Sequence, residues 1–566
     1  AGTYSVVTTL SCGDAVASCV QEVYDASGAQ GDVLLSRTEG FGTPLARTTT
    51  FEYNRMGQLI TRTAPDGGVT TYAYDTAGRV VKESSPWGAN GERVVETTYR
   101  TDGSSRSSEP ARIVTKLATD SSVATVRTEE YTYSTSDDVE RVECRTTAGT
   151  PATTQLTVTE TYTAAYAHPH AAGRPRMSQA ANGVQTWYQY TATSLHGALY
   201  SVTTETRVEG APVAGQSTRS VEYISADGNV LRSESYLLLS SGVWALTSGE
   251  SHQYDTQNRR IATLHDNGRS RSCGYICTGE LLWEVDEDGV RTDYGYDASR
   301  RLMETIRSEV RDGETVITPE TITTYTRDAA GRVLTTRRDV GPMTTTESMV
   351  YDILGRVTSR TDSLGRITST AYSEDGLTTS LTTPAGATLI TTRNRDGSVA
   401  HLAGTGQREL FYVYDLNGNN ARETVKPADN TTILSQTITT DFGQVVAQAQ
   451  PNANGGFIYS RSEYNAKGQL TKQYQDTGWN TAKTAATLYE YDAFGNVVKQ
   501  TLALTSSPTP QNSPVTEMAY GAESLTDGIY RTVTRTRYNA AGNPLVSVQK
   551  SLVSNLSDTL ESKNLT

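Results

Sequence analysis

The phrase Tyr72–Val80, which reads YAYDTAGRV, decides the fold of this chain. It returns with small changes as YDILGRV at Tyr351–Val357 and as YDAFGNV at Tyr491–Val497. An early copy around Tyr53 precedes the one around Tyr74 by 21 positions. Similarity at such a short interval is the signature of a repeat protein, in which each repeat is one supersecondary unit.

Most copies contain a tyrosine, an aspartate or asparagine directly after it, and a glycine three residues after that aspartate or asparagine; the copy at Asp328 has Arg327 in place of the tyrosine. We call this pattern the Tyr-Asp motif and expect its residues to have a structural role. They are Tyr53, Gly57, Tyr74, Asp75, Gly78, Tyr254, Asp255, Tyr296, Asp297, Asp328, Gly331, Tyr351, Asp352, Gly355, Tyr414, Asp415, Gly418, Tyr464, Asn465, Gly468, Tyr491, Asp492, Gly495, Tyr538, Asn539 and Gly542.

The residue types explain what one unit forms. Alternating Thr, Tyr and Val before the motif predict a β-strand. Tyr72 and Tyr74 are two positions apart, so their rings share one face of the sheet, where we expect tyrosines to stack across strands. The aspartate accepts backbone N–H bonds and the glycine adopts a positive φ, so the motif itself predicts a turn. Dipeptides such as Asp66-Gly67 and Asp288-Gly289 mark the opposite turn of each hairpin.

An isolated hairpin is marginally stable, so consecutive hairpins must pair edge to edge. The sequence therefore predicts an all-β fold: one long, spiralling antiparallel sheet that forms a hollow shell or coil, because long twisted sheets curl. We expect residues 1–566 to be one continuous segment, part of a longer chain or assembly. The repeats are clear at about 51–100 and 250–545 and degenerate at about 101–250, where longer or bulged hairpins are expected.

Composition excludes several classes of protein. The chain has 36% hydrophobic residues, a net charge of −13 and 32 tyrosines against 6 phenylalanines. So many tyrosines argue against disorder. They favour sheet faces that are partly exposed to solvent, where the ring is covered and the hydroxyl makes a hydrogen bond. The acidic balance argues against a nucleic-acid partner, and no apolar run reaches the roughly 18 residues of a membrane span.

The five cysteines include two local pairs, Cys12 with Cys19 and Cys273 with Cys277, and Cys144 is left over. Each pair is a possible disulfide if the protein is exported. Buried free thiols are the alternative interpretation.

The motifs of common enzymes are missing: the sequence has no phosphate-binding loop, no HExxH and no GxSxG. His168 and His170 could offer two imidazoles to a metal, but no cluster of further ligands lies nearby in sequence, and a loop is the better interpretation. Asp286–Gly289 lacks the spacing of a calcium loop and is expected to be a hairpin turn. We therefore predict no catalytic residues, no metal and no cofactor.

Two further sets of side chains could bind a ligand. The tyrosine ladders could receive sugar rings, although cross-strand stacking explains their spacing better. Four arginines recur directly after the motif glycine, and we expect them to pair with aspartate or to stack on a tyrosine of the neighbouring repeat. They are Arg79, Arg332, Arg356 and Arg366.

The phrases YDTAGRV, YDILGRV, YDLNGN and YDAFGNV resemble the YD repeats of the Rhs superfamily, which includes Rhs effectors, the B and C components of Tc toxins, and teneurins. The resemblance runs from about Tyr24 to about Leu545. It implies a β-sheet strip that spirals into a shell around a toxic domain, or one that presents an adhesion surface. The self-cleaving DPxGL-type motif of toxin cores is not found, since Asp362–Gly365 lacks the proline.

The resemblance implies a structural scaffold of a secreted or cell-surface protein, with its own flanking domains, enclosed cargo or further copies of itself as partners. An adhesin that binds glycans or proteins is the second hypothesis, and a polysaccharide-active enzyme is the third. A membrane span within this segment is not expected.

Overall fold

The computed structural model describes residues 3–12, 15–26, 32–101, 107–312, 314–453, 455–476, 486–504, 513–538, 542–554 and 564–565. Within these ranges the chain is almost entirely β-strand, and the helical structure is a single 3₁₀ turn, Leu195–Gly197. None of the described helical structure is long and apolar enough to cross a membrane. The prediction of an all-β fold is confirmed.

By their contacts, the strands fall into two compact units. Unit 1 comprises Ala1–Val126, Gly274–Glu284 and Val290–Gln436, and unit 2 comprises Arg127–Cys273, Val285–Gly289 and Thr437–Thr566.

The strands that lie wholly in unit 1 are mostly short. They are β1 (Thr3–Cys12), β2 (Ala15–Asp25), β3 (Val33–Glu39), β4 (Arg47–Tyr53), β5 (Leu59–Thr63), β6 (Val69–Tyr74), β7 (Val80–Trp87), β8 (Gly91–Tyr99), β9 (Pro110–Thr119), β22 (Arg291–Tyr296), β23 (Leu302–Arg307), β24 (Val310–Asp312), β25 (Thr315–Thr318), β26 (Thr321–Arg327), β27 (Val333–Val340), β28 (Met343–Tyr351), β29 (Val357–Thr361), β30 (Ile367–Tyr372), β31 (Thr378–Thr382), β32 (Thr388–Arg393), β33 (Val399–Ala403), β34 (Leu410–Asn417) and β35 (Asn420–Pro427).

Unit 2 contains many of the longer strands. They are β11 (Val139–Ala148), β12 (Thr153–Tyr162), β13 (Pro175–Gln179), β14 (Val184–Ala192), β15 (Tyr200–Val208), β16 (Thr218–Ile224), β17 (Val230–Leu238), β18 (Trp244–Tyr254), β19 (Arg260–His265), β37 (Val445–Pro451), β38 (Phe457–Tyr464), β39 (Leu470–Asp476), β40 (Ala486–Tyr491), β41 (Val497–Ala503), β42 (Val515–Leu525), β43 (Gly528–Tyr538), β44 (Pro544–Ser554) and β45 (Asn564–Leu565). Four strands contain residues of both units: β10 (Ser122–Ser136), β20 (Ser270–Tyr275), β21 (Leu281–Val285) and β36 (Ser435–Thr439).

Strands that follow one another in the chain pair in antiparallel fashion, as in β4 with β5, β28 with β29 and β40 with β41. The exception is the hairpin of β24 and β25, which forms its own two-stranded sheet while β23 pairs directly with β26. The long antiparallel sheet of consecutive hairpins is therefore confirmed. Where the sequence repeats are degenerate, strands are long: β10 has 15 residues, against 5 in β5 and in β29.

The register has a recurrent feature at the motif. Tyr351 pairs with Val357 six residues later, and the register shifts between Val350 and Tyr351. The same shift at the motif tyrosine occurs in β4–β5, β6–β7, β22–β23, β38–β39 and β40–β41. Since a bulge bends a strand and increases its twist, each motif adds local curvature to the sheet.

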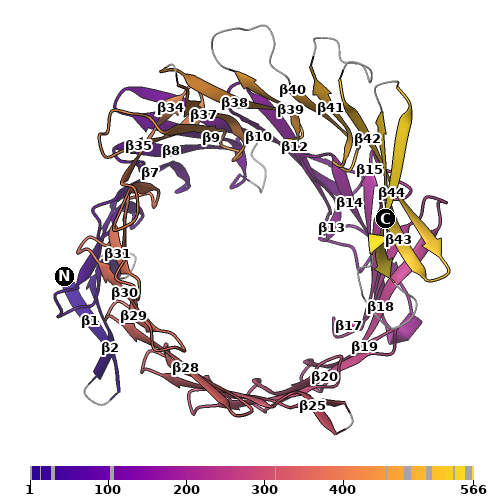
Figure 1. Ribbon diagram of the computed structural model, residues 1–566, viewed down its shortest axis with the longest axis horizontal. Coiled ribbons are helices and arrows are strands. Elements are labelled where there is room, and N and C mark those ends of the chain that lie inside the picture. Colours follow the sequence, from indigo (N-terminus) through magenta and orange to yellow (C-terminus); the bar gives the residue numbers. More distant parts are fainter. Residues whose placement is uncertain are drawn as a thin grey trace. The chain divides into compact units, whose positions relative to one another are not determined.

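Within each unit, segments that are far apart in sequence lie side by side (Figure 1). In unit 1 the guanidinium of Arg395 donates to the carbonyl of Asp66 at 2.9 Å, across 329 residues of chain, and the N–H of Gly88 donates to Asp396 at 2.5 Å. In unit 2 the Nδ2 of Asn496 donates to the side chain of Gln216 at 2.8 Å, 280 residues away. The strip of hairpins therefore returns to lie beside itself.

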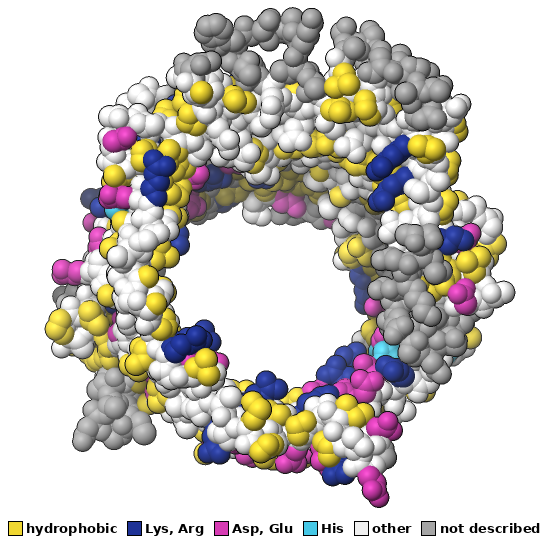
Figure 2. Space-filling model, viewed as in Figure 1, with side chains coloured by type: hydrophobic (Ala, Val, Ile, Leu, Met, Phe, Trp, Pro, Cys, Tyr) yellow, Lys and Arg dark blue, Asp and Glu magenta, His cyan; other side chains and the backbone are white. Residues whose placement is uncertain are grey.

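The described residues form few buried apolar clusters. One of them lies where two stretches of the sheet that are far apart in sequence, which we call two passes of the strip, contact each other. In unit 2, Leu237 and Leu239 pack against Ala522 and Ile529, and all four are more than nine-tenths buried. Elsewhere many large apolar side chains are exposed, as at Leu364 and Met343. Figure 2 shows apolar side chains in small groups among uncharged polar ones, with basic residues beside acidic ones.

Candidate functional site

The aspartate of the motif closes a turn and holds the arginine that follows it. In the first regular copy, Asp75 Oδ1 accepts the N–H groups of Ala77 and Arg79, and Oδ2 accepts the Arg79 Nε at 2.7 Å. The same aspartate–arginine pair is formed by Asp255 with Arg259, Asp297 with Arg301, Asp328 with Arg332, Asp352 with Arg356, and Asp362 with Arg366.

These hydrogen bonds favour the charged carboxylate. The Arg79 N–H and guanidinium hold the pKa of Asp75 below its ordinary value, and the corresponding arginines do so for Asp255 and Asp362. At Asp297 the Arg301 N–H is the main cause of the lowered pKa.

The fourth residue of this turn has a left-handed backbone. Gly355 has φ +81°, and its N–H donates to the Asp352 carbonyl at 3.0 Å. In two copies another residue occupies this position with a positive φ: Asn258 at 60° and Arg300 at 65°. Left-handed conformations are unfavourable for most residues with a Cβ, so these two turns are held by their surroundings.

The motif tyrosine joins each hairpin to the preceding one. Its hydroxyl donates to the carbonyl of the residue that opens the strand after the previous turn, as from Tyr74 to Leu59 at 2.6 Å. The same bond is made by Tyr254, Tyr296, Tyr351, Tyr372, Tyr414, Tyr464 and Tyr491. Tyr538 donates instead to Glu517, and burial raises the pKa of Tyr53.

Arginine, rather than a second tyrosine, covers the ring of several motif tyrosines. The guanidinium carbon of Arg356 lies 4.3 Å from the ring centroid of Tyr372, and that of Arg332 lies 4.8 Å from Tyr351. The ring–ring contacts found in the described residues involve other positions, such as Tyr162 with Tyr166. The predicted stacking of tyrosines is therefore wrong for these copies: the arginine held by the turn aspartate fills the space over the next ring.

Not every copy forms the predicted turn. At Tyr414 the strand continues through Asp415, which pairs across the hairpin with Arg422 at 2.7 Å, and the turn lies at Gly418. Asn465 and Asp492 form the usual turn. Gly57, Gly78, Gly331, Gly468, Gly495 and Gly542 all have positive φ, and Asn539 lies outside the described residues.

The cysteines do not form the proposed pairs. Cys277 is a free thiol in the turn that follows Ile276, and the Cys273 Sγ lies 3.2 Å from the Arg260 carbonyl. Cys19 is a free thiol opposite Thr9. Three residues of strand separate Thr9 from Cys12, about 10 Å, which exceeds the reach of a disulfide. The side chain of Cys12 itself lies outside the described residues.

The two histidines lie in the loop between β12 and β13. The His170 ring stacks on Tyr200, with centroids 4.5 Å apart, and the backbone N–H of His170 donates to the Nδ1 of His168 at 3.4 Å. No group of three or more potential ligands for a metal occurs among the described residues. Asp286–Gly289 is a turn, in which the Gly289 N–H donates to the Asp286 carbonyl at 2.9 Å.

A different network replaces the motif where the sequence repeats are degenerate. Trp187, Glu205 and Arg219 lie opposite one another on β14, β15 and β16 and so share one face of the sheet. Glu205, only 5% exposed, accepts hydrogen bonds from Arg207 at 2.7 Å and from Arg219 at 2.6 Å. Arg207 lies over Trp187, and Arg219 lies 4.1 Å from the Trp244 ring centroid.

The network continues toward β11. Arg176 also lies over the Trp187 ring, at 5.3 Å, and donates to Glu160 at 2.9 Å. Glu160, 8% exposed, accepts a second bond from Arg141 at 2.7 Å. We call these residues the Arg-Glu-Trp ladder: Arg141, Glu160, Arg176, Trp187, Arg207, Glu205, Arg219 and Trp244. Sequence reasoning missed it, although Glu205 and Arg207 at a two-residue interval were a usable signal.

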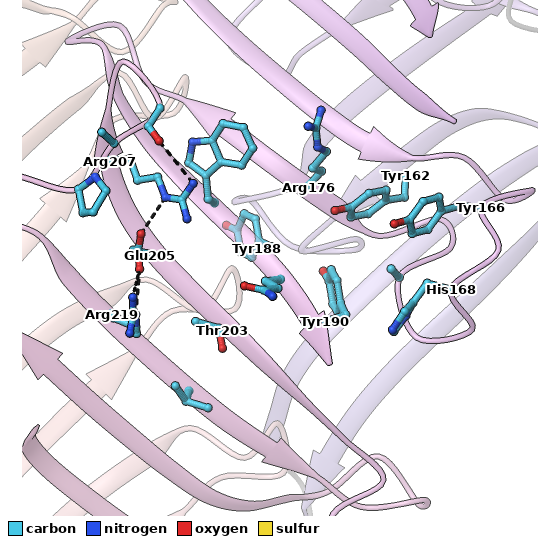
Figure 3. Close-up of a pocket in the computed structure, with 17 residues that line it drawn as sticks. Tyr162, Tyr166, His168, Arg176, Tyr188, Tyr190, Thr203, Glu205, Arg207 and Arg219 are labelled. Atoms are coloured by element: carbon cyan, nitrogen blue, oxygen red, sulfur yellow. Dashed lines mark hydrogen bonds and ion pairs between the residues drawn. The ribbon is translucent and has the colours of Figure 1, made fainter. Parts of the chain in front are cut away.

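A pocket of about 920 Å³ lies against this ladder in unit 2 (Figure 3). Its walls include Tyr162 and Tyr166, whose rings stack with centroids 4.4 Å apart, and Tyr190, whose ring meets Tyr162 edge-on at 6.4 Å. Burial raises the pKa of Tyr162 and of Tyr190. The other end of the pocket is lined by Arg207, Glu205 and Arg219.

The fold and the repeated turn define the class: an all-β protein of tandem hairpins joined by a Tyr-Asp motif. Residues 53–93 match the family model described as RHS Repeat, and residues 296–484 match the one described as Teneurin YD-shell. These two matches support the assignment of the chain to the YD-repeat, or Rhs-repeat, superfamily.

Solved structures of Tc toxins show a weaker likeness. The TcdB2-TccC3 crystal structure is 11% identical over 95% of this chain and 39% of that one, with a TM-score of 0.25. The Tc holotoxin pore of Photorhabdus luminescens is 11% identical, over 95% and 40%, with a TM-score of 0.25. TcdB2-TccC3-TEV is 10% identical, over 96% and 42%, with a TM-score of 0.26.

This chain thus spans about two fifths of the length of the first of these chains. The assignment therefore rests on the family models and not on these structures. No curated protein sequence matches the chain.

Proposed function

We propose that this chain is a structural wall segment of a secreted or cell-surface protein, which encloses cargo or builds an extracellular assembly. The observation that supports this role most is the engagement of the motif residues. The tyrosine hydroxyl, the aspartate and the following arginine hold the sheet together, as at Tyr372, Asp352 and Arg356, and so are occupied in building it.

The contacts between distant passes of the strip support the same role. Arg47 donates to the carbonyl of Asp375 and Arg332 donates to that of Ala17, so turns of one pass bond to another pass within unit 1. Lateral bonds of this kind make the sheet self-supporting without a thick apolar core. That property suits a wall better than it suits a compact catalytic domain.

The proposed partners are the flanking domains of the same protein, enclosed cargo, or further copies of the chain. Electron microscopy of the purified natural gene product tests the proposal. We expect particles with a low-density interior bounded by a layer one sheet thick. A solid particle of uniform density would contradict enclosure.

Cell fractionation tests the location. We expect the protein in the medium or at the cell surface, accessible to added protease in intact cells. Recovery of the whole protein from the interior of intact cells would contradict secretion, whatever the shape of the particle.

A further inference from the structure

The ladder pocket is built on a connection longer than the turns of the regular repeats. A twelve-residue segment, Thr163–Arg174, connects β12 to β13 and brings Tyr166 and His168 to the pocket wall, whereas ordinary connections in this sheet are short turns. The volume of about 920 Å³ lies within the range of roughly 300–1,000 Å³ in which small ligands bind. A longer connection that adds side chains to a concave surface is a common way of building a binding site.

The side chains of the pocket fit a polar ring-shaped ligand. Tyr162, Tyr166 and Tyr190 offer ring faces and edges against which the C–H face of a sugar can pack, and their hydroxyls can exchange hydrogen bonds. Gln189 and Thr203 add an amide and a hydroxyl. The aliphatic lining is limited to small side chains such as Ala211 and Val221, so a hydrocarbon ligand would find little surface.

The charge of the site favours an anion. Three arginines line the pocket, Arg176, Arg207 and Arg219, against one lining carboxylate, Glu205. Arg176 is also paired with Glu160. Arg174, which lies over Tyr190 and Tyr200, adds a further positive charge beside the pocket. This local excess of positive charge occurs in a chain with a net charge of −13, so it is a property of the site and not of the surface.

We propose that the pocket formed by Tyr162, Tyr166, Tyr190 and the Arg-Glu-Trp ladder binds an acidic oligosaccharide, a short chain of carboxylate-bearing sugar rings. The tyrosines pack against the sugar rings. The guanidinium groups of Arg176, Arg207 and Arg219 each have N–H donors beyond those that bond to glutamate, and these donate to the sugar carboxylates. This binding activity is independent of the proposed structural role.

The site binds the sugar without cleaving it. Glycoside hydrolysis requires two carboxyl groups that are available for acid–base or nucleophilic work. Glu205 and Glu160 are each held by two arginines and are therefore committed to the ladder.

Calorimetric titration of the purified chain tests the proposal. The probes are a galacturonic acid trimer, a galactose trimer and inorganic sulfate. We expect the acidic trimer to bind at least about tenfold more tightly than the other two, with an affinity that falls as salt rises. Equal binding of the neutral trimer, or no binding of the acidic trimer, would overturn the proposal, and tighter binding of sulfate would reduce the site to a simple anion site.

Variants in the loop separate binding from folding. Tyr166 lies outside the strands, so Tyr166→Ala leaves strand pairing intact, and we expect it to weaken binding about tenfold while Tyr166→Phe retains it. Tyr489→Ala, on β40 away from the pocket, is the matched control and should bind as the unmodified chain does. Unchanged binding by Tyr166→Ala would show that the sugar, if bound, lies elsewhere.

Discussion

The hydroxyl of Tyr372 donates a hydrogen bond to the backbone carbonyl of Val357, 2.9 Å away, and thereby fixes one hairpin to the hairpin before it. Val357 opens the strand that follows the Gly355 turn, so the bond joins the end of one unit to the start of the previous one. The bond lies under the guanidinium of Arg356, which covers the Tyr372 ring.

Removal of this hydroxyl should weaken the local sheet. In Tyr372→Phe the Val357 carbonyl loses its donor, and we expect the free energy of local opening of β29 and β30 to fall by about 1 kcal/mol. Amide hydrogen exchange measures it. Tyr325→Phe is the control, because the Tyr325 hydroxyl makes no hydrogen bond within the described residues, and an equal effect of both variants would contradict the assigned role.

Acid should open the turns that have an aspartate before it opens those that have an asparagine. The folded pKa values of Asp75 and Asp362 are lowered, so their contribution to stability is complete above the unfolded value of about 3.9 and is lost as the pH falls through the folded values. We expect protection of the Arg79 and Arg366 amides to decline below about pH 4. The Gln469 amide, bonded to Asn465, should not show this decline.

At the fourth position of the turn, replacing glycine by alanine and replacing a non-glycine residue by glycine should change stability in opposite directions. Gly355→Ala places a Cβ at φ +81° and should lower stability by about 1 kcal/mol. Arg300→Gly removes the Cβ from a residue at φ +65° and should raise stability by roughly 0.5–1 kcal/mol, since its ion pair with Glu280 is made by a guanidinium side chain that is more than half exposed and is therefore screened by water. Chemical unfolding of both variants measures the two changes, and a loss of stability in Arg300→Gly would contradict the argument.

The buried carboxylate of the ladder should be essential to unit 2. Glu205→Gln leaves Arg207 and Arg219 without their shared anion, and breaking such a buried pair costs about 3 kcal/mol. We expect hydrogen exchange in β14, β15 and β16 to rise together. The control Glu222→Gln, an exposed residue on β16, should have little effect.

The contact between two passes in unit 2 should depend on one hydroxyl. Ser240 Oγ accepts the N–H of Ala522 at 3.0 Å, and Ala522 is 1% exposed. Ser240→Ala leaves that N–H buried without a partner, so we expect a loss of about 1–3 kcal/mol, seen as faster exchange at Ala522. Ser241→Ala, at the exposed neighbouring position, should leave the exchange rate unchanged.

The sequence predicted the fold because each level of the repeat agrees with the next. The spacing of Tyr72 and Tyr74 predicted a strand, Asp75 and Gly78 predicted the turn, and the interval between copies predicted pairing of consecutive hairpins. These are local rules, in which residues a few positions apart contact one another. The arginine after the glycine makes one contact of each kind. Its aspartate partner is four residues away and follows from a local rule, whereas the tyrosine ring that it covers belongs to the next repeat.

The candidate site could not be predicted in the same way. Trp187, Arg207 and Glu205 come together because β14 and β15 pair in a particular register, and no repeat marks that register in the sequence. The stacking of motif tyrosines was wrong for a related reason. The spacing fixed which face each ring shares, but it did not decide between a second tyrosine and the arginine after the turn, both of which were expected, as the group that covers Tyr372. The spacing of residues in a strand determines the face on which each side chain lies. Which neighbouring side chain then contacts it depends on the other side chains of that face.

The bonds between passes, such as that of Arg395 with Asp66 across 329 residues, make this molecule unlike an open repeat array. In an open array each unit contacts only the units next to it, so the gain or loss of one unit changes only those contacts. Here a hairpin added to the main sheet between Asp66 and Arg395 would move the later turns out of step with their lateral partners, whereas a hairpin that leaves the main sheet, as β24 and β25 do, would not. The number of hairpins in the main sheet between those partners therefore decides whether this lateral bond can form.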